Sequence, residues 1–233
     1  MEAIRFTSEL LEIENVNEES KILTFSVQEN FIFKAGQYMT MAFYKDGKRM
    51  LRSYSICSSP SKKGKIKVYF KKVKEGFASN KLFNMKIGEK IEMKGPSGFF
   101  AVDSKEEDIF LISSGTGFGP FRSIVLDLLE NGFNKKLILI RGYRTEKDLC
   151  CKRELDNLKS KHSNFVYYDI LSQPKSQYYL LKGRVQKFIP QFLPKDFKGK
   201  FYLCGLKEMV LESRETLEKL GISKDKIFSE RYS

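Results

Sequence analysis

The hydrophobic and polar positions follow two different rhythms along the chain. Up to about residue 102, short apolar-rich runs are separated by Gly, Asp and Pro. These runs lie at 21–27, 37–44, 52–59, 65–73 and 89–95. Runs rich in β-branched and aromatic residues with such breaks are typical of antiparallel strands, and "SNKLFNM" allows one short helix. We therefore expect a small antiparallel barrel in the first half.

The second half alternates apolar runs with segments of helix length. After the charged stretch "DSKEED" at 103–108, the runs are "IFLIS", "KLILIRG", "NFVYYDI" and "KFYLCG". Strands that alternate with helices predict a parallel sheet with right-handed crossovers. We expect two domains, residues 1–102 and 103–233.

Composition narrows the class of protein. The chain has 233 residues, 41% of them hydrophobic and 13% aromatic, as in a globular protein with a core. No apolar run approaches the roughly 20 residues that span a bilayer, and the N-terminal residues lack a signal-peptide pattern. The four cysteines form no CxxC pair, so we expect no metal and a cytoplasmic location.

The positive charge is concentrated in the first half. The net charge is +13, and the stretch from Lys62 to Lys94 holds 11 lysines against three glutamates. A solvated lysine-rich surface explains such an excess without any function. The functional alternative is an acidic partner, and no nucleic-acid-binding motif accompanies the lysines.

A glycine-rich loop suggests the chemistry. Gly115, Gly117 and Gly119 lie between the run "IFLIS" and an amphipathic segment that ends before Gly132, with Pro120 in the first helical turn. Backbone N–H groups at a helix N-terminus attract phosphate. A tight turn that needs positive φ is the structural alternative. Because strand, loop and helix are all expected here, we favour a pyrophosphate site.

The next segment bears on the choice of nucleotide. The end of "KLILIRG" carries no acidic residue that would accept hydrogen bonds from a ribose 2′-hydroxyl. Instead, Arg141, Arg144, Lys152 and Arg153 follow, and cations suit a 2′-phosphate. This pattern favours NADPH over NADH, although ordinary surface charge would explain it as well.

Six motifs in order resemble the ferredoxin–NADP reductase family. They are "RSYSICSS" (52–59), "GFASNKLF" (76–83), "GPSGFF" (95–100), "GTGFGP" (115–120), "YLCGLKEM" (202–209) and "ERY" (230–232). The resemblance implies a six-stranded antiparallel flavin-binding barrel and a five-stranded parallel nucleotide-binding sheet. It also implies FAD, with FMN less expected, and NADPH or NADH as cofactors.

The resemblance assigns roles to individual positions. Arg52 would contact the flavin pyrophosphate, Tyr54 would stack on the flavin ring, and Ser55, Cys204 and Glu230 would be catalytic. Side chains alternate along a strand, so Arg52 and Tyr54 share one side while Ser53 faces the other. The implied cofactor contacts are Arg52, Ser53, Tyr54, Ser55, Gly76, Ala78, Ser79, Gly115, Thr116, Gly117, Pro120, Arg144, Lys152, Cys204, Gly205, Met209 and Tyr232.

The implied activity is hydride transfer from NAD(P)H to the flavin, followed by release of single electrons to a protein. An acidic ferredoxin or flavodoxin would suit the lysine-rich barrel. Two alternatives stay open: a reductase for an oxygenase component, free flavin or ferric complex, and a non-enzymatic flavin- or nucleotide-sensing module. We expect no nucleic acid or membrane partner, and a monomer or weak dimer. A nucleic-acid binder is the least favoured reading.

Overall fold

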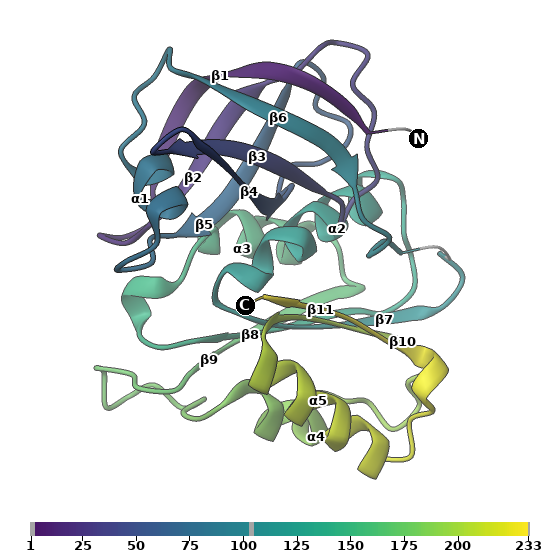
Figure 1. Ribbon diagram of the computed structural model, residues 1–233. Helices are drawn as coiled ribbons and strands as arrows, with labels where there is room; N and C mark the ends of the chain where they lie inside the picture. Colours follow the sequence, from purple (N-terminus) through teal and green to yellow (C-terminus); the bar gives the residue numbers. More distant parts are fainter. Residues whose placement is uncertain (1–2, 103–104, 233) are drawn as a thin grey trace. The chain divides into compact units, whose positions relative to one another are not determined.

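The computed structural model describes residues 3–102 and 105–232. Its contacts divide the chain into two units (Figure 1). The first runs to Val102 and includes Gly119–Asp127, and the second holds the preceding stretch up to Phe118 and the chain from Leu128 onward. The expected division at residue 102 stays a prediction.

The first unit contains one antiparallel sheet. Its described strands are β1 (Ile4–Asn15), β2 (Ser20–Ser26), β3 (Tyr38–Lys45), β4 (Lys48–Ser55), β5 (Lys65–Lys71) and β6 (Lys90–Ser97), in the order β4-β3-β6-β1-β2-β5. A bridge between Ile56 and Val68 joins the two edges just beyond β4. The expected six-stranded barrel is confirmed, with α1 (Phe77–Phe83) following β5.

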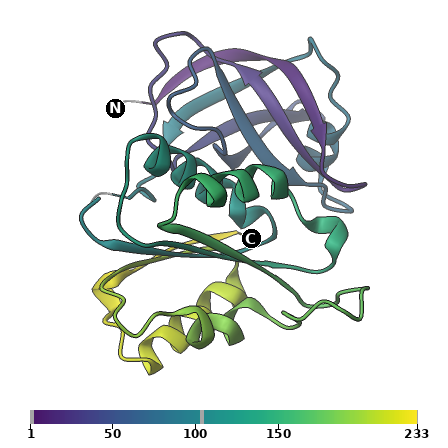
Figure 2. The ribbon, with the colours of Figure 1, turned by 180° about the vertical axis from the view of Figure 1, so that it is seen from behind.

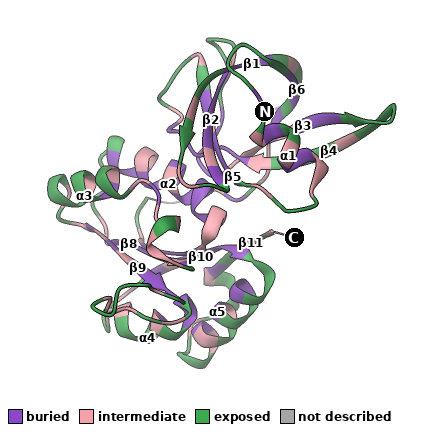
Figure 3. Ribbon diagram, turned by 90° about the vertical axis from the view of Figure 1, so that its left-hand side faces the viewer, coloured by how far each residue is buried: buried purple, intermediate pink, exposed green. Residues whose placement is uncertain are grey.

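The barrel core follows the period-two pattern of its strands. In β6, Ile91 and Met93 are buried while Lys90, Glu92 and Lys94 are exposed (Figure 3). The buried side of the sheet collects apolar side chains from all six strands and α1. Burial of this apolar area supplies the main free energy that holds the unit together.

The second unit contains one parallel sheet. Its described strands are β7 (Asp108–Ser114), β8 (Leu137–Tyr143), β9 (Phe165–Leu171), β10 (Gly199–Leu206) and β11 (Ile227–Tyr232), in the order β11-β10-β7-β8-β9. The five-stranded sheet is confirmed. Sequence patterning predicted four of these strands individually and missed the last, which is short and half polar.

Helices cover both faces of the parallel sheet. In Figures 1 and 2, α4 (Ile189–Phe192) and α5 (Lys207–Lys219) lie on one face and α3 (Lys152–Lys161) on the other. Met209, Val210 and Leu217 of α5 pack into the core beside Ile112 and Leu203. β7, β8, β9 and β10 are mostly buried because helices cover both sides, whereas the edge strand β11 is partly exposed.

The remaining helix, α2 (Phe118–Glu130), follows a 3₁₀ turn at Gly115–Gly117. It ends before Gly132, which adopts φ +74° and stops the helix as expected. Among the described residues, we find no helix that combines the length and the apolarity needed to cross a membrane.

Candidate flavin and nucleotide sites

Arg52 and Tyr54 lie on the same side of β4. Tyr54 packs edge-on against Phe70, with ring centroids 6.1 Å apart, and it joins the barrel core as a half-buried ring. Ser53 faces the other way and lies 3.2 Å from the Thr40 hydroxyl. The alternation expected for this strand is therefore present.

The environment of β4 leaves the Arg52 guanidinium able to bind a ligand. Its side chain is exposed, and its Nη1 donates a hydrogen bond to the Leu51 carbonyl at 2.8 Å. A guanidinium has five N–H donors, so several remain for a phosphate. Burial raises the pKa of Tyr54 to about 12, so its ring is neutral at physiological pH. Ser55, opposite Tyr38 in β3, is buried.

The loop before α1 is closed by the side chain of Ser79, which lies in the first turn of α1. Ser79 Oγ accepts a hydrogen bond from the Val73 amide at 3.0 Å and donates one to the Gly76 carbonyl at 3.1 Å. A Cβ on Gly76 would lie 2.8 Å from Ser79 Oγ and 2.9 Å from Val73 Cβ, so only glycine fits. Ser79 and Ala78 are buried, and Ser79 shapes this loop; their predicted contacts with flavin phosphates stay predictions.

Two glycines after β7 serve different physical needs. Gly115 has φ +53°, and no heavy atom lies within 4 Å of the position its Cβ would take. A Cβ on Gly117 would instead lie 2.2 Å from the Cys204 carbonyl oxygen. Gly117 therefore permits close packing against β10, whereas Gly115 leaves an open cradle beside the backbone. Thr116 lies between them, and Pro120 is buried in the first turn of α2.

A third group forms where β10 and β11 end. Cys204 pairs with Glu230 and Leu206 with Tyr232 in the parallel register. Burial and the nearby Glu230 raise the pKa of the Cys204 thiol, while a hydrogen bond with Tyr232 acts in the opposite direction. The structure thus brings three predicted site residues together.

Gly205 joins this group to the glycine loop. It adopts φ +146°, and its Cβ would lie 2.4 Å from Ser114 Oγ and 2.9 Å from Met209 Cε. The Leu206 amide donates to Ser114 Oγ at 3.3 Å. Ser114 was missed from the sequence, although its place at the end of β7 could have suggested it.

Arg141 is not a free cation, and its expected role beside a 2′-phosphate is wrong. Its side chain is fully buried and donates to both Asp169 carboxylate oxygens, at 2.8 and 3.0 Å. Lys152 is exposed but bonds Asp156 on its own helix at 2.8 Å. Arg144 is exposed and donates from Nε to Gln173 Oε1 at 2.9 Å. Of the three, Arg144 is the one that contacts the loop after β9.

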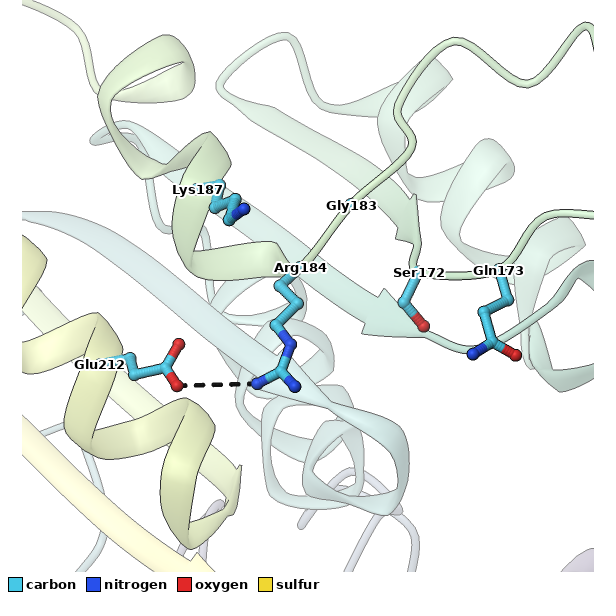
Figure 4. Close-up of a pocket in the computed structure, with 6 residues that line it drawn as sticks. All are labelled: Ser172, Gln173, Gly183, Arg184, Lys187 and Glu212. Atoms are coloured by element: carbon cyan, nitrogen blue, oxygen red, sulfur yellow. Dashed lines mark ion pairs between the residues drawn. The ribbon is translucent and has the colours of Figure 1, made fainter.

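That loop borders a polar pocket of about 510 Å³ (Figure 4). Arg184 Nη1 lies 3.6 Å from Glu212 Oε1, and Gln186 also donates to the Glu212 carboxylate. The lining residues are Ser172, Gln173, Gly183, Arg184, Lys187 and Glu212. The sequence pattern did not predict this pocket. The signal that could have indicated the pocket is the position of Ser172 and Gln173. They directly follow a buried strand, just as the glycine loop does.

Comparison with known proteins decides the family. Residues 7–102 match the model of the oxidoreductase FAD-binding domain, and residues 111–215 match that of the oxidoreductase NAD-binding domain. NADH-cytochrome b5 reductase 1 of Dictyostelium discoideum is 30% identical over 92% of this chain and 77% of its own length. The chain belongs to the ferredoxin–NADP reductase family.

Another relative is named as one component of an enzyme. Phenol 2-monooxygenase reductase component DmpP of Pseudomonas sp. (strain CF600) is 31% identical over 86% of this chain. The chain spans 58% of the length of that relative. The fold also matches the Amycolatopsis cytochrome P450 reductase GcoB, with a TM-score of 0.90 at 22% identity over 98% of this chain and 70% of that one.

The two family domains bind FAD and NAD, and the side chains present fit both groups. Arg52 offers exposed donors on the same side of β4 as the half-buried Tyr54 ring. Gly115 offers an open cradle of the kind that a pyrophosphate fills. Each unit therefore carries residues suited to its own cofactor.

Proposed function

We propose that the chain transfers electrons from NAD(P)H, through FAD, to a protein acceptor. One observation supports the proposal. The Gly115 cradle, Arg144, the pocket and Gly205 all lie at the carboxyl end of the parallel sheet, where β7, β8, β9 and β10 end. Open α/β sheets bind ligands at that end. A dinucleotide has a charged middle and two flat ends, and this end of the sheet offers a site for each.

The proposed FAD site lies at β4. Arg52 would hold the FAD pyrophosphate through planar N–H donors, and Tyr54 would support the ring system on the same side of the strand. Bound FAD supplies the ability to take up a hydride and to release electrons one at a time. Because Tyr54 stays neutral and packs on Phe70, it gives the ring a fixed apolar surface.

Two places in the second unit would hold the two parts of the nucleotide: the cradle at Gly115 and the pocket. The backbone of the Gly115–Gly117 turn would accept the pyrophosphate, and the pocket would take the adenosine end. Arg184 and Lys187 line that pocket, with Arg144 held beside it by Gln173. Glu212 offsets part of this positive charge. The remaining excess of cations supports a preference for NADPH.

Cys204, Glu230 and Tyr232 would surround the nicotinamide end. The raised pKa of Cys204 keeps its thiol protonated, so its role is packing and polarity, not nucleophilic attack. Glu230 is half-buried and adjacent in the register, which suits a polar contact with the nicotinamide amide. Ser55 would supply a hydroxyl on the flavin side.

For the acceptor, the charge of the chain supports an acidic one-electron carrier such as a ferredoxin or flavodoxin. The net charge of +13 would speed encounter with an acidic protein. A second candidate is an oxygenase component, because the relative DmpP is named as the reductase component of phenol 2-monooxygenase. Turnover with each acceptor in parallel separates the two.

The test is an absorbance spectrum followed by stopped-flow reduction. We expect yellow protein that NADPH reduces faster than NADH. Tyr54→Ala should lose flavin, and Arg52→Gln should weaken FAD binding. Tyr44→Ala is a matched control, since Tyr44 is an exposed tyrosine of the same sheet that bonds Glu92. Colourless protein that takes up no FAD would overturn the proposal, and bound FAD without steady turnover would favour a sensing module.

A further inference from the structure

One loop of the second unit supplies both ends of a wall of the pocket. This loop is residues 172–183, which follow β9, and we call it the strap. Ser172 and Gln173 at its start and Gly183 at its end line the pocket (Figure 4). The position of the strap therefore decides the shape of that wall.

The strap has little apolar burial to hold it in place. The structure describes all of its residues, and none of them is buried. The side chains of Tyr178 and Leu180 are 81% and 92% exposed. A segment with so few buried contacts depends on hydrogen bonds for its order. Tyr179 supplies one of them, from its hydroxyl to the Asp169 carbonyl at 2.9 Å.

Glu146 supplies two more hydrogen bonds from outside the strap. Its Oε2 accepts a hydrogen bond from the Lys175 amide at 3.0 Å, and its Oε1 accepts one from the Ser176 amide at 2.9 Å. We call these two bonds the Glu146 clamp. They lower the pKa of the Glu146 carboxyl below its ordinary value, so the group is a carboxylate at neutral pH.

The turn that carries Glu146 is itself well fixed. Glu146 begins the short 3₁₀ turn that follows β8, and the Thr145 amide and hydroxyl both donate to Asp148 Oδ2 at 3.0 Å. The same loop includes Arg144, whose carbonyl accepts a hydrogen bond from the Gln173 amide at 2.8 Å. This loop therefore holds the strap at the pocket and again at the clamp.

We propose that Glu146 is a positioning residue for nucleotide binding, because it holds the strap in the form in which Ser172 and Gln173 line the pocket. The inference rests on the proposed function, in which the pocket takes the adenosine end. When a binding site is formed only part of the time, the apparent dissociation constant rises by the inverse of that fraction. Loss of the clamp should therefore weaken nucleotide binding and leave the chemical step unchanged.

Two substitutions of Glu146 test the proposal. Glu146→Ala removes both acceptor oxygens, whereas Glu146→Gln keeps one carbonyl oxygen and removes the same charge. A difference between the two variants therefore reports hydrogen bonding and not charge. The assay uses the FAD-loaded chain with NADPH or NADH, and menadione, a small neutral quinone, takes up the two electrons.

We expect Glu146→Ala to raise the KM for NADPH by about tenfold and to leave kcat within about twofold of the wild-type value. The KM for NADH should rise alike, because the strap shapes the wall of the pocket. Glu146→Gln should lie between wild type and Glu146→Ala. Hydrogen–deuterium exchange of the strap peptide should be faster in Glu146→Ala, and added NADP⁺ should slow it.

Asp108→Ala is the matched control. Asp108 also accepts hydrogen bonds from two backbone amides, that of Lys136 at 3.0 Å and that of Lys198 at 3.3 Å. It begins β7, whereas the strap follows the end of β9, so the two carboxylates act at opposite ends of the parallel sheet. Asp108→Ala should leave both KM values unchanged, because KM does not depend on the amount of folded protein.

The outcomes separate the two proposals. Wild-type protein that takes up no FAD or reduces no menadione contradicts the proposed function itself. Normal wild-type turnover with an unchanged KM in Glu146→Ala contradicts the role of Glu146 alone. The same holds if Asp108→Ala raises the KM equally, or if Glu146→Ala lowers kcat with no change in KM. A lower KM in both Glu146 variants would show that the charge of Glu146 acts on the nucleotide and its clamp does not.

Discussion

Arg141 in β8 and Asp169 in β9 form a two-point ion pair inside the nucleotide-binding unit. The Arg141 side chain is fully buried, and its third donor group holds the Cys150 carbonyl at 2.8 Å. Rings of Phe118, Tyr143 and Tyr167 lie over the guanidinium at 4.6 to 5.4 Å. Through its hydrogen bond to the Cys150 carbonyl, Arg141 also holds the chain in place just before α3.

Breaking this pair should be strongly destabilising. Asp169→Leu leaves a buried guanidinium without its carboxylate, and we expect the free energy of unfolding to fall by about 3–5 kcal/mol. The double variant Arg141→Met/Asp169→Leu should lose less, because no unpaired charge remains. Urea unfolding followed by circular dichroism measures both.

A surface pair provides the control for that prediction. Lys136 and Asp196 also form an ion pair, but both side chains are exposed. Asp196→Leu should leave unfolding nearly unchanged. Equal losses in the single and double buried variants would show that packing, and not charge, makes this position sensitive.

Gly115 and Gly117 should respond differently to alanine. Gly117→Ala places a Cβ against the Cys204 carbonyl, and we expect a loss of about 1–3 kcal/mol in unfolding free energy. Gly115→Ala meets no atom but imposes a left-handed conformation, at a cost of about 1–2 kcal/mol. Because that methyl enters the proposed pyrophosphate cradle, the KM for NADPH should rise for folded Gly115→Ala protein. A variant with unchanged KM would contradict the cradle.

Sequence patterning predicted the fold because the signals were local. Alternation along each strand foretold that Arg52 and Tyr54 share a side and that Ser53 does not. The spacing of glycines between a strand and a helix foretold the turn at Gly115–Gly117. Such features depend on neighbours in the chain, so one sequence suffices to predict them.

The errors concern partners that are distant in sequence. Arg141 was expected to be a free cation because its pairing with Asp169, 28 positions away, becomes visible only when β8 and β9 lie side by side. The pocket was missed for the same reason: Arg184 and Glu212 are separated by α4 and β10. The residues next to Arg141 or Arg184 in the sequence do not indicate which charged side chain each one will contact in the folded protein.

The ionisation of Tyr54 should report its burial in flavin-free protein. Its pKa rises from 10 in the unfolded chain to about 12 in the folded one, chiefly through burial, with Arg52 acting in the opposite direction. The folded state then holds the proton longer, so stability is full below pH 10 and falls as the pH rises toward 12. Absorbance of tyrosinate should show one fewer late-titrating group in Tyr54→Phe, whereas an unchanged late phase would contradict burial.

The four thiols should differ in reactivity. Cys57, Cys150 and Cys204 are buried and Cys151 is partly exposed. With iodoacetamide at pH 8, native protein should be alkylated at Cys151 first, and Cys204 should stay unmodified because its pKa is raised. Peptide mass spectrometry reads the sites. Early modification of Cys204 would imply that β10 and β11 open in solution.

The pocket should discriminate between the two nucleotides through charge. Arg184→Leu removes a cation from it, so the KM for NADPH should rise about tenfold, a loss typical of a charged hydrogen bond. The KM for NADH and both kcat values should change little, since a 2′-phosphate is bound equally before and during the reaction.

Glu212→Gln should have the opposite effect and lower the KM for NADPH, because it removes the negative charge that pairs with Arg184. Arg153→Leu is the control, because Arg153 is exposed on α3 and does not line the pocket. If Arg184→Leu raises the KM for both nucleotides alike, the pocket holds a part that they share, and the preference for NADPH must arise elsewhere.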